Sequence, residues 1–348
     1  MRKPVVVFGA GGLIGKAVTK YFADQGVETL GVTSQMVDLT IPGDVERFFQ
    51  DSCPAGVINC AGVVGGIVSN LANGYDLGSI NALIEVNVLN AARRAGIERL
   101  VNLGCGCCYP NNKTFPMTAQ EIWSGPIEPS SRAYSLAKLL GIELVNQQRL
   151  SSPEWISVIP SNVYGPGDNF SPEHSHVIPA MIRRFILAKL DQGGPAKGSK
   201  AKSTSPDGNV SEGDPPAKSG SSGIIEFMGT GSAIRQFIHT DDVASAIYLV
   251  YSRADKLGPV VNIAGPETTS IEDLAHLTGR VVGYCGTISF SGRGSNGTPV
   301  KVLDGSALAA LGWSPSFTLE YGLEDTLAQM RVLARQGELR GWDLGDQF

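Results

Sequence analysis

The chain has 348 residues, of which 42% are hydrophobic and 18% are charged, and its formal net charge is −5. This length is about twice that of a usual ~150-residue domain, so the chain can bury one full core and a second lobe. The composition excludes a small disulfide scaffold and a mostly disordered chain. No basic block accompanies the mild acidity, which argues against nucleic acid as a main partner and leaves a small anionic metabolite as a fitting one.

The N-terminus reaches glycines after only four apolar residues, Val5 to Phe8. A secretory signal needs a longer apolar stretch, and the sequence has no run of about 20 apolar residues that could span a membrane. Three of the six cysteines crowd at Cys105, Cys107 and Cys108, a spacing that suits neither ordinary disulfide pairs nor a complete zinc site. We therefore expect reduced thiols, no bound metal, and a cytoplasmic protein without membrane contact.

Strand-like and helix-like segments alternate through the first part of the chain. The hydrophobic pattern predicts strands over residues 5–8, 29–32, 57–59 and 100–103, and helices over 13–24, 45–50 and 80–95. Short strands made only of apolar residues are typical of a parallel sheet that is buried on both faces. We expect an α/β fold with a doubly wound parallel sheet and a smaller C-terminal α/β lobe.

A different composition interrupts this pattern at residues 193–223, which are rich in Gly, Ser, Lys, Pro and Asp. Such a segment cannot bury enough apolar surface to order itself, so we interpret it as a flexible insertion. After it, the pattern predicts a strand over 224–228, a helix over 240–251 capped by Thr240 or Asp241, and a strand over 260–264.

Glycines follow the first predicted strand directly and precede the first predicted helix. They allow the backbone to approach a pyrophosphate, which the helix N-terminus attracts. A strand, a glycine turn and a helix at the start of an α/β chain predict a dinucleotide-binding Rossmann domain. The cofactor contacts expected from this turn are Gly9, Gly11, Gly12, Leu13, Ile14 and Gly15.

The end of the second predicted strand bears on the choice between NAD and NADP. An acid there binds a ribose 2′-hydroxyl, whereas an arginine binds a 2′-phosphate. Residues 32–35 (VTSQ) offer neither, so the sequence leaves both cofactors open. Further on, Asp38 and Leu39 look like contacts to the adenine ring, although Asp38 also suits a solvated turn.

Tyr134 and Lys138 are four residues apart, which places a phenol and an ammonium on one face of a helix. We expect the cation to lower the pKa of the phenol, so that Tyr134 exchanges a proton with a carbonyl or alcohol oxygen while the cofactor moves hydride. Lys138 can also hold the nicotinamide ribose. The pair predicts a nicotinamide-dependent oxidoreductase.

Further motifs extend over most of the chain. By these motifs the chain resembles the extended short-chain dehydrogenase/reductase superfamily, also described as the NAD-dependent epimerase/dehydratase family, and within it most closely the GDP-L-fucose synthase branch. The motifs are residues 64–67 (VGGI), 81–92 (NALIEVNVLNAA), 107–110 (CCYP), 125–129 (GPIEP), 161–166 (SNVYGP), 168–170 (DNF), 175–180 (SHVIPA), 235–239 (RQFIH) and 297–299 (GTP).

Members of that branch epimerise C3 and C5 of GDP-4-keto-6-deoxymannose and reduce its C4 ketone with NADPH. The resemblance implies that Cys107 and His176 are the epimerisation acid/base pair, that Tyr134 and Lys138 carry the reduction, and that Cys105 takes the place of a hydroxyl donor to the C4 oxygen. The chemistry is coherent, because the C4 ketone acidifies the neighbouring hydrogens and a thiol and an imidazole can exchange them.

The resemblance also implies binding residues, an arrangement of domains and a homodimer. The domains are a dinucleotide-binding domain at 1–160, to which residues of about 224–265 return, and a mainly substrate-binding lobe at 161–330. Further cofactor contacts are Ala61, Gly62, Val63, Leu103, Tyr134, Lys138, Pro160, Asn162, Val163 and His176. Contacts to the nucleotide-diphosphate sugar, whose phosphates suit guanidinium groups, are Cys107, Asn162, Val177, Arg184, Met228, Arg235 and Arg293.

Several positions depart from the family pattern. A thiol at Cys105 is a weak hydrogen-bond donor, Gly11 and Val32 or Ser34 stand where members have arginines for the 2′-phosphate, and Met228 replaces a base-stacking aromatic residue. These departures leave two alternatives to an epimerase/reductase. One is a redox-neutral nucleotide-sugar epimerase with tightly bound NAD(P), and the other is a non-catalytic dinucleotide-binding regulator.

Overall fold

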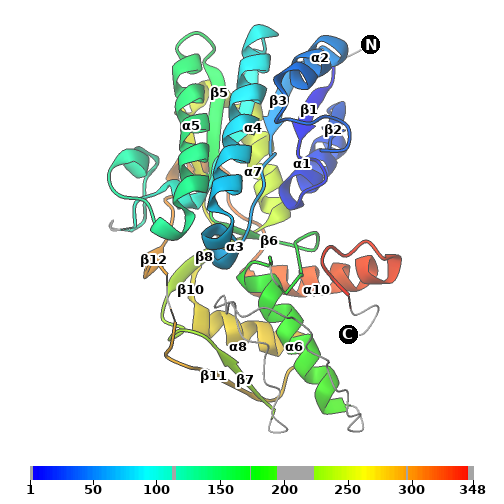
Figure 1. Cartoon of the computed structure of the whole chain (residues 1–348), viewed down its shortest axis with the longest axis vertical. Helices are drawn as coiled ribbons and strands as arrows, with labels where there is room; N and C mark the ends of the chain where they lie inside the picture. Colours follow the sequence, from blue (N-terminus) through cyan, green and yellow to red (C-terminus); the bar gives the residue numbers. More distant parts are fainter. Residues whose placement is uncertain (1–2, 112–114, 173, 194–222, 295–296, 344–348) are drawn as a thin grey trace.

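The computed structural model describes residues 3–111, 115–172, 174–193, 223–294 and 297–343. Figure 1 shows two lobes in these residues, an upper one with the N-terminus and a lower one near the C-terminus. The insertion expected at 193–223 lies outside the described residues, except for the glycine at each end.

A parallel sheet forms the centre of the upper lobe. Its strand order is β2-β1-β3-β4-β5-β9, so β1 lies between β2 and β3. All four residues of β1 are buried, as a strand covered on both faces requires. The strands are β1 (Val5–Phe8), β2 (Thr29–Val32), β3 (Gly56–Asn59), β4 (Arg99–Leu103), β5 (Glu154–Pro160) and β9 (Val260–Ile263).

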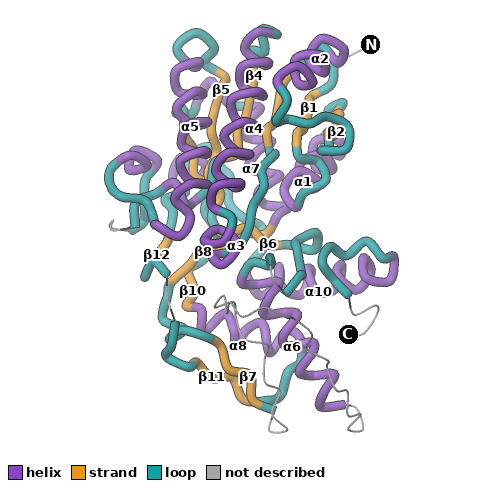
Figure 2. Tube along the Cα trace, viewed as in Figure 1, coloured by secondary structure: helices purple, strands orange, loops and turns teal. Residues whose placement is uncertain are grey.

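Helices cover both faces of this sheet (Figure 2). Side chains alternate along β1, so Val5 and Val7 enter one core while Val6 and Phe8 enter another. The first core includes residues of α1 (Leu13–Asp24) and α7 (Thr240–Ser252). The second includes residues of α2 (Pro42–Ser52), α4 (Gly74–Arg94) and α5 (Arg132–Arg149), and α3 (Ile67–Ala72) precedes α4. The predicted doubly wound α/β fold is confirmed.

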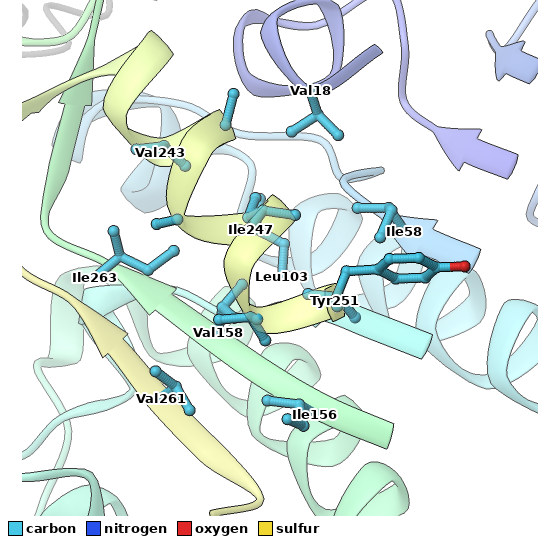
Figure 3. Packing of buried hydrophobic residues seen from close by; sticks show 14 of the residues in the cluster. Val18, Ile58, Leu103, Ile156, Val158, Val243, Ile247, Tyr251, Val261 and Ile263 are labelled. Carbon is cyan, nitrogen blue, oxygen red and sulfur yellow. The ribbon is translucent and has the colours of Figure 1, made fainter. Parts of the chain in front are cut away.

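Residues far apart in sequence meet in the first of these cores. Figure 3 shows Ile247 of α7 among Ile58, Leu103 and Val158, which belong to three different strands, with Val261 of β9 close by. Of the segment 224–265, α7 and β9 thus pack into the upper lobe. The strand before them, β7 (Ile224–Phe227), instead pairs with β11 (Thr287–Phe290) in the lower lobe.

The lower lobe is built around β8 (Ile234–His239), which pairs with three short strands. Its buried core joins α6 (Val177–Gly193), α8 (Ile271–Val282) and α10 (Leu319–Gln336) to the β7–β11 pair. The partners of β8 are β6 (Asn162–Tyr164), β10 (Thr268–Ser270) and β12 (Val300–Lys301). The short helices of the chain are η1 (Gly106–Cys108), η2 (Ala119–Trp123), η3 (Pro129–Ser131), η4 (Ala254–Lys256) and α9 (Ser306–Ala309).

Two helix starts differ from the sequence pattern. The helix α4 begins at Gly74, six residues before the predicted start, and its added turns lie close to α5, where a Cβ built at Gly78 would lie 2.9 Å from Cβ of Ala133. The cap of α7 is His239, not Thr240 or Asp241, because His239 still has the extended backbone of β8 and its Nδ1 accepts from the Asp241 amide at 3.4 Å. No helix among the described residues is long and apolar enough to cross a membrane.

Candidate active site

The glycine turn lies at a topological switch point of the upper sheet. The strands β2 and β3 pair with opposite edges of β1, so the connections after β1 and after β2 run to opposite sides of the sheet. In open α/β sheets, ligands bind at such a point. Gly9 has φ 75°, and the Gly12 amide donates to its carbonyl oxygen at 2.9 Å. A Cβ at Gly15 would overlap the Gly9 backbone, so only glycine lets α1 start this close to β1. The turn therefore fits a pyrophosphate at the start of α1.

The loop after β3 runs beside this turn. A Cβ built at Gly9 would lie 2.8 Å from the backbone nitrogen of Ala61. Asn81 of α4 fixes the backbone of this loop, because its Oδ1 accepts from the Val63 amide at 3.1 Å and its Nδ2 donates to the Val63 carbonyl at 2.9 Å. Ala61 therefore lies next to the glycine turn, and Gly62 and Val63, which follow it, are exposed.

The other expected cofactor residues lie in three places. Leu103, Pro160, Asn162 and Val163 lie at or just beyond the ends of β4 and β5, the edge of the sheet that also carries the glycine turn. Leu13 and Ile14 start α1, and the Leu13 carbonyl accepts from Thr240 Oγ1 at 3.3 Å. Asp38 closes a turn by accepting from Thr40 Oγ1 at 2.7 Å, and Leu39 is buried in the core, so their side chains serve the local structure.

Tyr134 and Lys138 lie on α5 as predicted, but the charge of Lys138 is already paired. Its Nζ donates to Glu85 Oε1 at 2.7 Å and to the Ala61 carbonyl at 3.3 Å, and the lysine side chain is only 3% exposed. Burial raises the pKa of Tyr134 well above its usual value of 10, and the neighbouring thiols and Glu85 raise it further. The pKa of the phenol is therefore raised and not lowered as expected, and burial is the main cause.

Sequence reasoning missed Glu85. The signal was present, since an acidic residue stands on the core-facing stripe of the α4 helix between apolar residues such as Ile84 and Val88. Acids on such a stripe are rare unless they are paired.

Three thiols gather directly after β4, around the short helix η1. Cys108 Sγ donates to the Ser135 carbonyl at 3.7 Å, and Cys105 Sγ lies 3.5 Å from Cys108 Sγ. Because Cys108 uses its one proton on the Ser135 carbonyl, Cys105 is the donor between these two thiols. The hydrogen bond to Cys105 and burial raise the pKa of Cys107 well above 9.0, so it is a neutral thiol. All six cysteines are free.

His176 stands just before α6 and faces the thiols. Its side chain is 46% exposed, and its Nδ1 lies 3.8 Å from Oδ1 of the buried Asp168. The nearby carboxylate of Asp168 raises the pKa of His176 above 6.5, and Cys107 contributes in the same direction. Asp168 is held by the Asn169 amide, which donates to the same Oδ1 at 2.7 Å. Asp168 belongs to a motif noted in the sequence, yet its role as partner of His176 became visible only in the fold.

Arg235 also lies near the thiols, since Cys107 contributes to its electrostatic environment. Glu128 also lies near Arg235 and accepts from Ser130 Oγ at 2.9 Å and Thr298 Oγ1 at 2.9 Å. Burial lowers the pKa of Arg235, and Glu128 partly offsets that effect. Glu128 therefore contributes a negative charge near this arginine.

The remaining expected substrate residues lie on the lower lobe. Arg184 of α6 stacks over Phe227 with 4.5 Å between its guanidinium carbon and the ring centroid, and it donates to the Glu226 carbonyl at 2.7 Å. Met228 is 48% exposed, and the Gly229 amide next to it donates to the Arg293 carbonyl at 2.7 Å. Val177 begins α6, next to His176.

Comparisons with known proteins agree with this arrangement. The model of the NAD dependent epimerase/dehydratase family matches residues 5–264. GDP-L-fucose synthase 1 of Arabidopsis thaliana is 35% identical over 92% of this chain and 91% of its own length. GDP-L-fucose synthase of Escherichia coli is 32% identical over 98% of this chain and 99% of its own.

A solved structure described as a GDP-6-OMe-4-keto-L-xylo-heptose reductase from C. jejuni superimposes with a TM-score of 0.83. It is 25% identical, and the match covers 95% of this chain and 99% of that one. The family model covers most of the chain, and the relatives are similar along almost their whole length. The chain therefore belongs to the NAD-dependent epimerase/dehydratase family.

Proposed function

We propose that the protein is an NAD(P)-dependent nucleotide-sugar epimerase/reductase of the GDP-L-fucose synthase type, acting on an NDP-4-keto-6-deoxyhexose. The observation that carries the proposal is that Tyr134 and Lys138 of α5, the thiols of Cys105 and Cys107 after β4, and His176 before α6 converge at one edge of the upper sheet. Relatives named GDP-L-fucose synthases support the same substrate class.

In the reductive step, the nicotinamide cofactor supplies hydride to the C4 carbon when it is bound. The glycine turn and the loop at Ala61–Val63 would hold its pyrophosphate, and Lys138 would hold its ribose. Tyr134 then gives a proton to the C4 oxygen. A phenol whose pKa lies well above 10 is fully protonated at neutral pH, which suits a proton donor for ketone reduction.

In the epimerisation step, Cys107 and His176 exchange the protons at C3 and C5. One of the two groups must be unprotonated to remove a C–H proton. The structure instead favours the protonated form of both, because it raises the pKa of Cys107 and that of His176. One proton must therefore leave the pair before the first abstraction, and His176 loses it at the lower pH because its usual pKa is 6.5 and that of Cys107 is 9.0. Proton exchange should accordingly speed up as pH rises through the His176 pKa.

The deciding experiment is incubation of the protein with GDP-4-keto-6-deoxymannose and NADPH or NADH in deuterated water. Nicotinamide absorbance reports hydride transfer, and mass spectrometry of the sugar reports deuterium at C3 and C5. Both signals together are expected. The absence of both signals with this substrate and with other 4-keto nucleotide sugars would overturn the proposal.

A second candidate is a redox-neutral epimerase that keeps NAD(P) tightly bound. It is favoured by Cys105, because a thiol that already lies 3.5 Å from Cys108 Sγ is a weak donor to the C4 oxygen. Loss of an oxyanion donor typically costs about 10²–10³ in rate. In the same experiment, deuterium entry without cofactor oxidation would select this candidate.

We also infer a homodimer that forms through the outer faces of α4 and α5. These helices lie side by side (Figure 1) and expose apolar residues: Leu83 is 46% exposed, Leu136 51% and Leu140 40%. Light scattering after gel filtration would give the mass of the particle. The free thiols of all six cysteines suit a reducing compartment such as the cytoplasm.

A further inference from the structure

We propose that Glu85 is a positioning residue of the reductive site, whose carboxylate fixes the ammonium of Lys138 against the end of β3. This inference rests on the roles proposed above for Tyr134 and Lys138. It assigns a function to a residue that touches neither cofactor nor substrate and acts through Lys138.

The carboxylate of Glu85 belongs to a fully paired network in the protein interior. Glu85 is 0% exposed, and its Oε1 accepts from Lys138 Nζ at 2.7 Å. Its Oε2 accepts from Asn102 Nδ2 at 2.9 Å, and Asn102 Oδ1 accepts from Asn59 Nδ2 at 2.8 Å. Asn59 Oδ1 finally accepts from the Ala61 amide at 3.3 Å. The network thus connects α5, α4, β4 and β3, and every member restricts its neighbours.

Both ends of the network meet at Ala61. Its amide donates to Asn59, while its carbonyl accepts from Lys138 at 3.3 Å. An ammonium has three donors, and Glu85 and the Ala61 carbonyl use two of them. One N–H of Lys138 therefore remains for a group outside the chain, such as a hydroxyl of the cofactor ribose. Glu85 determines where that donor stands.

The charge of Lys138 depends on the same carboxylate. Burial alone lowers the pKa of Lys138, but Glu85 outweighs burial and the pKa is raised above 10.5. The other titratable groups around the ammonium are the phenol of Tyr134 on α5, the thiols of Cys105 and Cys108 after β4, and that of Cys60 after β3. Burial raises the pKa of Cys60 to about 12 and that of Tyr134 well above its usual value, so these two groups are neutral at neutral pH. Among the residues that the structure describes, Glu85 is the carboxylate paired with Lys138.

The absence of a side chain at Gly141 leaves the space that the Glu85 carboxylate occupies. Gly141 lies on α5, three residues after Lys138, and a Cβ built there would lie 3.0 Å from Cγ of Glu85 and closer to its carboxylate. A side chain at this position would push Glu85 away without changing any charge. Gly141 therefore offers a second, independent way to disturb the pair.

The first test is Glu85→Gln, compared with wild type and with Glu143→Gln, a control on α5 whose carboxylate contacts only the neighbouring Asn146 and Gln147. The dissociation constant for NADPH is measured from its fluorescence at pH 6 and pH 9. Without the anion, the buried ammonium loses its proton at a lower pH. The dissociation constant at pH 9 divided by that at pH 6 should be about tenfold larger in the variant than in wild type. One pH unit above the pKa of an amine, about a tenth of the amine is still protonated and able to bind as an ammonium. The Glu143→Gln variant should keep the wild-type ratio.

The second test is Gly141→Ala, which should weaken NADPH binding in the same direction and with the same pH dependence, while thermal unfolding reports whether the variant is folded. If Glu85→Gln does not fold, Gly141→Ala decides the matter. Folded variants whose NADPH binding follows the wild-type pH dependence would overturn the proposal. A wild-type chain that binds the cofactor but turns over no nucleotide sugar would overturn only the substrate part of the proposed function, whereas one that binds neither NADPH nor NADH would overturn both.

Discussion

The two halves of the site are built in different ways. The reductive half, Lys138 with Glu85, is 3% and 0% exposed and is held by helices and strands of the upper sheet. The epimerising half, His176 with Asp168, has an imidazole that is 46% exposed and a donor–acceptor distance of 3.8 Å, and it lies on the loop before α6. A buried pair resists solvent and contributes to folding, whereas an exposed pair remains adjustable. Substitutions should therefore affect stability in the first half and mainly proton exchange in the second.

The largest expected effect separates the two halves directly. Tyr134→Phe removes the proton donor of the reductive half and should lower hydride transfer by about 10³-fold or more. Deuterium entry at C3 and C5 should continue, since Cys107 and His176 remain. Following both signals in one sample in deuterated water tests this separation, and a parallel loss of both would show that the halves act as one unit.

Glu85→Ala should show how much the buried half contributes to the free energy of unfolding. It leaves the ammonium of Lys138 buried without its counter-ion, which costs about 3–5 kcal/mol of unfolding free energy. Urea denaturation followed by fluorescence measures this cost. The matched change in the other half is His176→Ala, which should cost less than about 1 kcal/mol, since the imidazole is 46% exposed and lies 3.8 Å from Asp168. Equal losses for the two variants would contradict the comparison.

Cys105→Ser should restore a strong donor at the C4 oxygen. A hydroxyl donates better than a thiol, and an oxyanion donor is worth up to about 10²–10³ in rate, so we expect cofactor oxidation to rise by at least about tenfold. Stopped-flow measurement of nicotinamide absorbance checks it, with Cys285→Ser, on the surface, as the control. An unchanged rate would mean that Cys105 does not limit the reduction.

Met228→Trp should sharpen recognition of the nucleotide base. Met228 is half exposed on the lower lobe, next to the Arg293 loop, at the position to which the family resemblance assigns a base-stacking aromatic residue. Stacking is worth about 0.5–1.5 kcal/mol, so GDP should bind about threefold to tenfold more tightly. Isothermal titration with GDP measures the change. Equal affinity in both proteins would remove Met228 from the base site.

The smallest expected effect is a shift in pH dependence. Asp168 raises the pKa of His176, so Asp168→Asn should lower it. The imidazole then loses its proton at a lower pH, and the rising limb of the deuterium-exchange profile should move toward lower pH. Rates of exchange between pH 5 and pH 9 test this sign. A limb that moves upward or stays in place would contradict the pairing of the two residues.

Much of the fold followed from local patterns. The strand of Val5–Phe8, the glycine turn after it and the α1 helix are visible in the sequence, because a buried parallel strand needs consecutive apolar residues and a close turn needs glycine. The pairing of Lys138 was not visible, since Glu85 and Lys138 are 53 residues apart and meet only when α4 packs on α5. The sequence reasoning therefore expected Lys138 to lower the pKa of Tyr134, whereas burial raises it.

By itself the sequence determined the α/β class, the glycine turn and the residue types of the site, because these depend on composition and short-range spacing. The tertiary structure decided which of these groups are neutral, which are paired and which direction their pKa values take. Such properties depend on burial and on charges brought from distant segments, as with Asp168 beside His176 and Glu85 beside Lys138. Local patterns specify the parts of this site, and long-range packing specifies their protonation.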